Sequence, residues 1–184
     1  MKAVKVWIYN ETGRKILDWE PEPDGVKELP DPAKAALDPK DVPTIEQLYL
    51  TGLHLEQYRH ATYSPVDYYQ EALKRDPLDV RSNNAMGLWL IRKGQFAKAA
   101  PYLRNAIKRL TERNPNPYDG EPSYNLGLSL KYQGKLDEAY DAFYKACWNG
   151  AWQDAGYFSL AQISVIRKDW ENALYEIDKS LLRN

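Results

Sequence analysis

The stretch NNAMGLWLIRKGQFAKAAPYLRNAI at residues 83–107 recurs as SYNLGLSLKYQGKLDEAYDAFYKAC at residues 123–147. The alignment keeps small residues in register, pairing Gly87 with Gly127, Gly94 with Gly134, Ala99 with Ala139 and Ala106 with Ala146. Apolar residues on both sides of the central glycine have the spacing of amphipathic helices. Each copy is therefore predicted to be a pair of helices joined by a short turn.

A third copy, YFSLAQISVIRKDWENALYEIDKSL at residues 157–181, places Ala161, Ala173 and Ser180 in register with the small residues of the second. The step from Gly87 to Gly127 is longer by six than the step from Gly127 to Ala161. The surplus lies in residues 113–122, which are rich in Asn, Pro, Asp and Gly. These residue types favour turns, so this stretch is predicted to be a loop inserted between two repeats.

Small residues in register have a physical reason, because two antiparallel helices pack closely where their side chains are small. The first helices supply Gly87, Gly127 and Ala161, and the second helices supply Ala99, Ala139 and Ala173. The large residues Leu103, Phe143 and Ile177 are predicted to fill the space between successive repeats. Gly94 and Gly134 are predicted to end the first helices of their repeats.

The last copy and the first full copy each depart from this pattern. Lys168 and Asp169 replace the glycine between the helices of the last copy. Pro101 falls inside a second helix, where a proline removes a backbone donor, so a kink or a late start of that helix is expected.

A degenerate copy precedes these three, with predicted helices over residues 44–60 and 65–75. Ser64 is suited to cap the second of these helices and Pro65 to its first turn. The sequence leaves open whether residues 45–76 form a complete repeat.

The N-terminal part of the chain does not follow the helical repeat pattern. Residues 1–19 contain two short alternating runs around a turn-like stretch and are predicted to be a β-hairpin. An isolated hairpin is marginal in water, so this one packs on the helices or is the edge of an upstream β domain. Residues 20–43 hold six of the twelve prolines and are predicted to be an extended connector, either a free spacer or a strap on the repeats.

Composition narrows the function classes. The 184 residues include 25 basic and 26 acidic side chains, giving a net charge of −1, which favours neither a nucleic-acid nor a membrane partner. No apolar stretch approaches the roughly 20 residues of a membrane-spanning helix, and no signal-peptide pattern is present, so a cytoplasmic location is expected. The single cysteine, Cys147, is expected to be a small buried apolar residue.

The sequence offers no catalytic constellation. His54 and His60 lie six apart on one predicted helix and face different directions, so they are not expected to share a metal ion. No nucleophile elbow, phosphate-binding loop or zinc-helix motif occurs. We therefore expect neither enzyme activity nor a metal or cofactor.

The register of glycine, alanine and aromatic residues resembles the tetratricopeptide repeat family over about residues 44–184. The step from Gly127 to Ala161 matches the repeat period of that family, which is about 34 residues. The resemblance implies an all-α fold, a right-handed superhelix (α-solenoid) of four helix hairpins, behind the short N-terminal β-hairpin. The region that runs from residues 48–61 through residues 114–127 is also similar to the C-terminal repeat region of large bacterial proteins. In those proteins a β-rich, carbohydrate-associated domain of unknown function precedes the repeats.

Tetratricopeptide proteins bind extended peptides or partner helices on the concave face, which the first helices of all repeats line. Counting from the packing glycine or alanine, the predicted binding positions are Arg81, Asn84, Leu88, Arg92, Tyr124, Leu128, Lys131, Tyr132, Phe158 and Gln162. The same count from Gly52 in the degenerate copy gives Glu46, Tyr49, Leu53, Glu56 and Gln57. The tyrosines have an alternative role, which is packing against the proline-rich segment or the next helix.

The inserted loop is a second candidate, because functional groups are often added at one inter-repeat turn. Its Tyr118, Asp119 and Glu121 are predicted to reach a ligand, and the alternative is a merely tolerated surface loop. The clamp of lysines, asparagines and an arginine that chaperone-tail receptors of this family use is absent.

The leading hypothesis is a scaffold that binds a protein or peptide on its concave face, with homo-oligomerisation left open. The rival hypothesis is an accessory or oligomerisation region of a larger bacterial carbohydrate-active enzyme. The sequence does not identify the partner.

Overall fold

The structure is a computed structural model, and it describes residues 4–21 and 34–183. The chain divides into two compact units, residues 1–35 and residues 36–184. The middle of the predicted connector, residues 22–33, lies outside the described residues.

The first unit contains the predicted β-hairpin, which is confirmed. Strand β1 (Val6–Tyr9) pairs antiparallel with β2 (Lys15–Trp19). The Asn10 side chain closes the turn, because its Oδ1 accepts hydrogen bonds from the backbone N–H groups of Thr12 (3.1 Å) and Arg14 (2.8 Å). The cross-strand pairs Val6 with Trp19 and Ile8 with Leu17 place four apolar side chains on one face of the hairpin.

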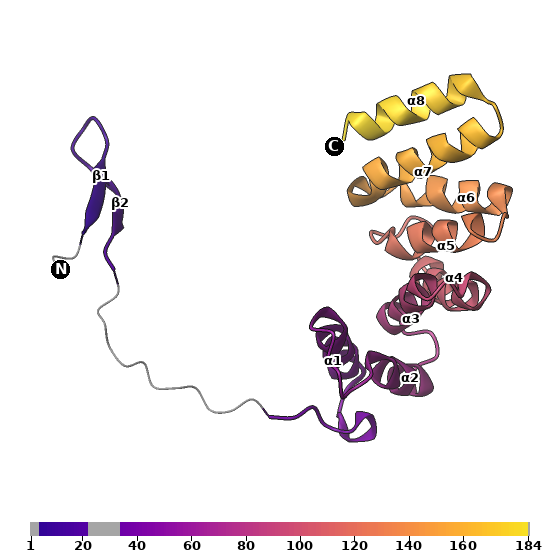
Figure 1. Cartoon of the computed structure of the whole chain (residues 1–184), viewed down its shortest axis with the longest axis horizontal. Helices are drawn as coiled ribbons and strands as arrows, with labels where there is room; N and C mark the ends of the chain where they lie inside the picture. Colours follow the sequence, from indigo (N-terminus) through magenta and orange to yellow (C-terminus); the bar gives the residue numbers. More distant parts are fainter. Residues whose placement is uncertain (1–3, 22–33, 184) are drawn as a thin grey trace. The chain divides into compact units, whose positions relative to one another are not determined.

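The second unit is an all-α solenoid, as predicted (Figure 1). Its α-helices, over residues 36–183, are α1 (Ile45–Gln57), α2 (Pro65–Arg75), α3 (Val80–Arg92), α4 (Phe96–Thr111), α5 (Glu121–Lys131), α6 (Leu136–Ala146), α7 (Gln153–Ile166) and α8 (Trp170–Leu181). Two single 3₁₀ turns accompany them, η1 (Pro39–Asp41) and η2 (Gly150–Trp152). Figure 1 shows that the helices stack in chain order, so each repeat touches its neighbours in sequence.

The glycines of the first helices lie where a large side chain of the second helix meets them. A Cβ atom at Gly87 would lie 2.6 Å from Leu103 Cδ2, and one at Gly127 would lie 2.5 Å from Phe143 Cδ1. Gly52 meets Tyr69 in the same way, at 2.5 Å from its Cε1 atom. Residues 45–75 therefore form a helix pair with the same contact as the two that follow.

This contact corrects one prediction. Leu103 and Phe143 do not only fill the space between successive repeats, because each presses on the glycine of its own repeat. Both side chains are completely buried, whereas Ile177 at the equivalent position of α8 is half-buried. The glycines are needed because the second helix carries a large residue at the point of closest approach.

The turns between paired helices keep one geometry in three repeats. Gly94 and Gly134 have φ angles of +70° and +75°, in the left-handed region that glycine adopts without steric cost. Lys168 takes the same place in the last pair with a φ of +62°. Asp169 then caps α8, its carboxylate accepting a hydrogen bond from the Asn172 N–H at 3.2 Å.

Of the two outcomes expected for Pro101, a kink or a late start of its helix, the late start is wrong. Helix α4 begins at Phe96 and runs through Pro101 to Thr111. The buried Ala99, Ala100 and Leu103 pack against the neighbouring helices on both sides of this position. Burial of this apolar face offsets the one hydrogen bond that proline removes.

Residues 36–42, here called the strap, lie on the first helix pair. The Tyr68 hydroxyl donates to the Leu37 carbonyl oxygen at 2.7 Å. Arg75 donates to the carbonyl oxygens of Pro39 (3.2 Å), Lys40 (3.1 Å) and Val42 (2.7 Å). Val42 is buried in the same small core as Leu48 and Leu55. This part of the connector is therefore a covering segment of the first repeat.

Cys147 is buried, as predicted, with 3% of its surface exposed. Burial, with a smaller contribution from the nearby Glu176, raises the pKa of its thiol from 9.0 to about 12. Since the folded chain holds this proton more tightly than the unfolded chain, the stabilisation is complete below pH 9 and is lost as the pH rises towards 12. Between pH 8 and pH 10 we expect the free energy of unfolding to fall by up to about 1.4 kcal/mol more in the wild type than in Cys147→Ala. Urea unfolding at both pH values measures this difference, and identical pH dependence in the two proteins would contradict the assignment.

None of the helices in residues 36–183 combines the length and apolar character needed to cross a bilayer.

Candidate ligand-binding groove

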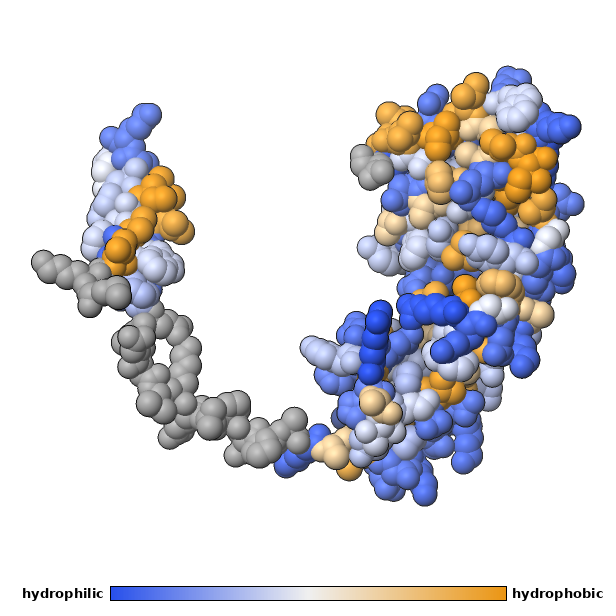
Figure 2. Space-filling model, viewed as in Figure 1, coloured by the Kyte–Doolittle hydropathy of each residue, from blue (hydrophilic) through white to orange (hydrophobic). Residues whose placement is uncertain are grey.

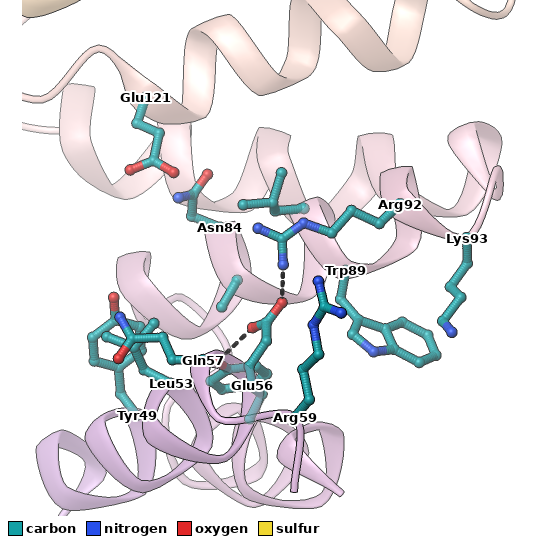
Figure 3. A pocket seen from close by; sticks show the side chains of 13 residues that line it. Tyr49, Leu53, Glu56, Gln57, Arg59, Asn84, Trp89, Arg92, Lys93 and Glu121 are labelled. Carbon is teal, nitrogen blue, oxygen red and sulfur yellow. Dashed lines mark hydrogen bonds and ion pairs between the residues drawn. The ribbon is translucent and has the colours of Figure 1, made fainter.

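A hollow of about 630 Å³ opens between α1 and α3, which are the first helices of the first two repeats (Figure 3). Helices α1 and α3 provide most of its walls, and Glu121 at the start of α5 reaches its edge. The lining residues at predicted groove positions are Tyr49, Leu53, Glu56, Gln57, Asn84, Leu88 and Arg92. The structure thus brings together predicted positions from two successive repeats.

An ion pair with a tyrosine forms the floor of this hollow. Glu56 Oε2 accepts a hydrogen bond from the Tyr69 hydroxyl at 3.0 Å, and its Oε1 is paired with Arg92. Burial and the neighbouring Glu56 carboxylate raise the pKa of Tyr69, so its hydroxyl remains a donor. Glu56 is mostly buried, whereas more than half of the Arg92 side chain is exposed. Arg92 therefore has guanidinium donors left for a ligand.

The two sides of the hollow differ in charge. Figure 3 shows Arg59, Trp89, Arg92 and Lys93 on one side and Tyr49, Gln57 and Glu121 on the other. The Lys93 ammonium lies 5.6 Å from the centre of the Trp89 ring. One side therefore offers cations next to an aromatic surface, which suits an acidic group carried by an apolar chain.

The count of groove positions missed Arg59 and Lys93 because both lie more than five residues after the packing glycines Gly52 and Gly87, where the count ends. Arg59 follows the last residues of α1 with a φ of +49°, and Lys93 caps α3. A count of positions along a helix face stops before such residues. For Lys93, a basic residue directly before the turn glycine is a signal that would have found it. Arg59 fell inside the helix predicted over residues 44–60, which in the structure ends earlier, at Gln57.

Arg81 lies beside this hollow but is held by its own partners. Its guanidinium lies 5.0 Å from the centre of the Tyr49 ring and 3.3 Å from a Glu46 carboxylate oxygen. These contacts hold the Arg81 side chain at the edge of the groove, near the start of α3.

The predicted residues of α5 divide between two roles. Tyr124 stacks on Trp152 at 4.8 Å between ring centres, and Leu128 packs against the main core cluster. Tyr132 stacks on Phe96 at 4.7 Å and remains exposed. These residues line neither the hollow between α1 and α3 nor a second one between α7 and α8. Trp152 lies at the start of α7, so the stacking of Tyr124 agrees with its alternative role, which is packing against the next helix.

A second hollow of about 650 Å³ lies between α7 and α8, and it contains the predicted residues Lys131, Phe158 and Gln162. The Lys131 ammonium donates to the Gln162 side-chain oxygen. Burial lowers the pKa of Lys131. The remaining residues of this hollow are apolar or small.

The inserted loop is anchored at its ends, and Tyr118 projects from it with 95% of its surface exposed. Asn116 accepts a hydrogen bond from the Lys145 ammonium at 2.7 Å, and Asp119 accepts one from the Glu121 N–H at 2.9 Å. Among the three loop residues predicted to meet a ligand, Glu121 lines the first hollow, whereas Tyr118 and Asp119 line neither hollow.

The histidines have local partners. The ring centres of His54 and Tyr58 lie 4.5 Å apart, and His60 Nδ1 accepts hydrogen bonds from the backbone N–H groups of Thr62 and Tyr63. Within the described ranges, no three His, Cys, Asp or Glu side chains gather as metal ligands.

The stacked helix pairs with their packing glycines define a tetratricopeptide-type fold, and solved structures of MamA share it. No family model matches the sequence. MamA 41-end from Desulfovibrio magneticus RS-1 is similar with a TM-score of 0.62 and 21% identity, over 76% of this chain and 75% of that chain. A crystal structure of MamA has a TM-score of 0.66 and 17% identity, over 78% of this chain and 80% of that chain. At these identities the likeness concerns the fold, and nothing in it supports the carbohydrate-enzyme alternative.

Proposed function

We propose that this chain is a scaffold that binds an extended acidic peptide segment of a protein partner along the inner faces of its first helices. The observation that carries the proposal is the hollow between α1 and α3, where Arg59, Arg92 and Lys93 gather beside Trp89. Tetratricopeptide-type stacking supports this use, because it presents several helices side by side to one chain.

The chemistry of the hollow favours an acidic segment over a neutral one. Glu56 already has Arg92 and Tyr69 as partners, so its negative charge is largely compensated. Arg59 and Lys93 then give the adjoining side a net positive charge. An aspartate or glutamate of the ligand pairs with these cations, while a neighbouring apolar side chain covers Trp89.

A peptide-display selection on the full chain, followed by calorimetric titration of the selected peptides, tests this function. We expect acidic residues to be enriched, and the double variant Arg59→Glu/Lys93→Glu to weaken binding about tenfold, equivalent to about 1.4 kcal/mol. The matched control is Lys108→Glu, an exposed lysine of α4 outside the hollow, which should leave the affinity unchanged.

Two results would count against this proposal. One is equal weakening by the Lys108→Glu control, because that would reveal attraction to overall charge and not to the hollow. The other is a selection that yields peptides without acidic residues, whose affinity the double variant does not change.

A further inference from the structure

The outer face of α8 is apolar at positions that are covered in the preceding repeat. Trp170, Leu174 and Leu181 occupy the repeat positions that Leu136, Tyr140 and Cys147 hold in α6. In α6 these positions are partly or completely buried, and α7 packs over that helix. In α8 the three side chains are 60%, 66% and 63% exposed. The last repeat thus presents a helix-packing surface that no described residue covers.

This surface continues across α7 into the second hollow. We define the terminal face by the apolar lining residues Phe158, Val165, Ile166, Trp170, Leu174 and Ile177. Figure 2 shows apolar side chains gathered over α7 and α8, whereas the surface around α1 to α3 is mainly hydrophilic. A contiguous apolar surface of this kind on a folded domain is typical of an interaction site.

At the opposite end of the solenoid, Leu37 and Leu50 are 58% and 50% exposed, but the other large apolar side chains of the strap and α1 are mostly covered. Leu48 and Leu55 of α1 are buried, and Val42 of the strap belongs to the same core. The strap is held there by the Arg75 and Tyr68 hydrogen bonds to its carbonyl oxygens. Head-to-tail stacking of copies would need an equally extensive apolar face at this end, so contact between two terminal faces is the better match.

Charge does not oppose such a contact. Residues 167–183 carry four basic side chains, Arg167, Lys168, Lys179 and Arg183, and four acidic ones, Asp169, Glu171, Glu176 and Asp178. Their charges sum to zero, so two copies of this segment do not repel each other. The same neutrality gives a strongly charged partner no advantage.

We propose that the terminal face binds the terminal face of a second copy of this chain, forming a two-fold symmetric dimer. Each copy supplies the same residues, as an isologous interface requires, and assembly stops at two because the face is used up. Two helices of this length present roughly 20 by 20 Å, about 400 Å² in projection. This is below the roughly 800 Å² per partner of a standard interface, so the expected dissociation constant is micromolar.

Sedimentation velocity of the full chain over about 1–300 μM, a range chosen to bracket a micromolar dissociation constant, tests the dimer. We expect the wild type to pass from monomer to dimer without larger species. Leu174→Glu and Ile166→Glu should each place a charge in the interface and keep the chain monomeric over the whole range. Both side chains are largely exposed, so the variants are expected to fold, which circular dichroism checks.

The matched control is Leu50→Glu, the same substitution at a side chain that is 50% exposed on α1. It should dimerise like the wild type. A wild type that stays monomeric at every concentration would overturn the proposal, as would a dimer that survives both terminal-face variants. Species that grow beyond the dimer, or loss of association in Leu50→Glu, would indicate head-to-tail stacking and overturn it too. The groove variants Arg59→Glu and Lys93→Glu leave the terminal face intact. The peptide-binding proposal and the dimer proposal are therefore tested independently of each other.

Discussion

Phe143→Ala is expected to lower the free energy of unfolding by about 3–5 kcal/mol. Phe143 is completely buried, and it belongs to the core cluster that connects α4 to α7. Removing its ring leaves a cavity that the flanking helices cannot close without losing their contacts. Urea unfolding followed by circular dichroism measures the loss.

The Phe143 ring also explains why position 127 is a glycine, so a second substitution at Gly127 tests the same contact. A Cβ at Gly127 would lie 2.5 Å from Phe143 Cδ1, so Gly127→Ala alone should cost about 1–3 kcal/mol by overpacking. In the Phe143→Ala background this ring is absent, and alanine becomes favourable because it forms helices better than glycine by up to about 1 kcal/mol. The second substitution should therefore change from destabilising to neutral or stabilising.

Tyr144→Ala is the matched control, since it removes an exposed aromatic residue next to Phe143 on the same helix. It should change stability by no more than about 0.5 kcal/mol. Strictly additive effects of Gly127→Ala and Phe143→Ala would show that the glycine is not needed for this contact, and the packing argument for the repeat would be wrong.

The repeat architecture could be predicted because it depends on the volume of the side chains at fixed positions of each repeat. Small residues recur wherever a large residue of the paired helix approaches, so Gly87, Gly127 and Ala161 mark the register without any structural information. The same register carries side chains such as Asn84 and Arg92 to the inner face, and both line the first hollow. Periodicity predicts the direction in which a helical residue points.

Periodicity does not predict contacts made by irregular segments or by long flexible side chains. The strap is fixed by Arg75 and Tyr68, whose partners are carbonyl oxygens far earlier in the sequence. Arg59 reaches the hollow from a left-handed backbone conformation after the end of α1. Tyr124 sits at a groove position yet stacks on Trp152, because an aromatic ring long enough to reach the next helix is stabilised by burial there.

A buried carboxylate is a further feature that the repeat pattern does not indicate. Glu176 of α8 is almost completely buried, and it accepts hydrogen bonds from Ser164 Oγ at 2.6 Å and from the Tyr140 hydroxyl. The equivalent positions of the preceding repeat are Leu130 for Ser164 and Ala142 for Glu176. The last repeat has therefore replaced an apolar contact by a polar network that ties α6, α7 and α8 together.

Glu176→Leu is expected to destabilise the fold by about 2–4 kcal/mol, although leucine is large enough to fill the space of the glutamate side chain. The substitution leaves the hydroxyls of Tyr140 and Ser164 without their acceptor, and each unsatisfied buried group costs about 1–3 kcal/mol. Burial, the largest cause of the raised pKa of Tyr140, remains after the substitution, so its hydroxyl stays protonated and cannot avoid this loss by ionising near neutral pH.

The triple variant Tyr140→Phe/Ser164→Ala/Glu176→Leu separates the loss of partners from the loss of the carboxylate. With all three polar groups removed, no donor of this network remains unpaired, and stability should return to within about 1 kcal/mol of the wild type. The control Glu171→Leu removes an exposed carboxylate of the same helix and should change stability by less than about 0.5 kcal/mol. A triple variant as unstable as Glu176→Leu would mean that the carboxylate itself, and not the pairing of its partners, stabilises the last repeat.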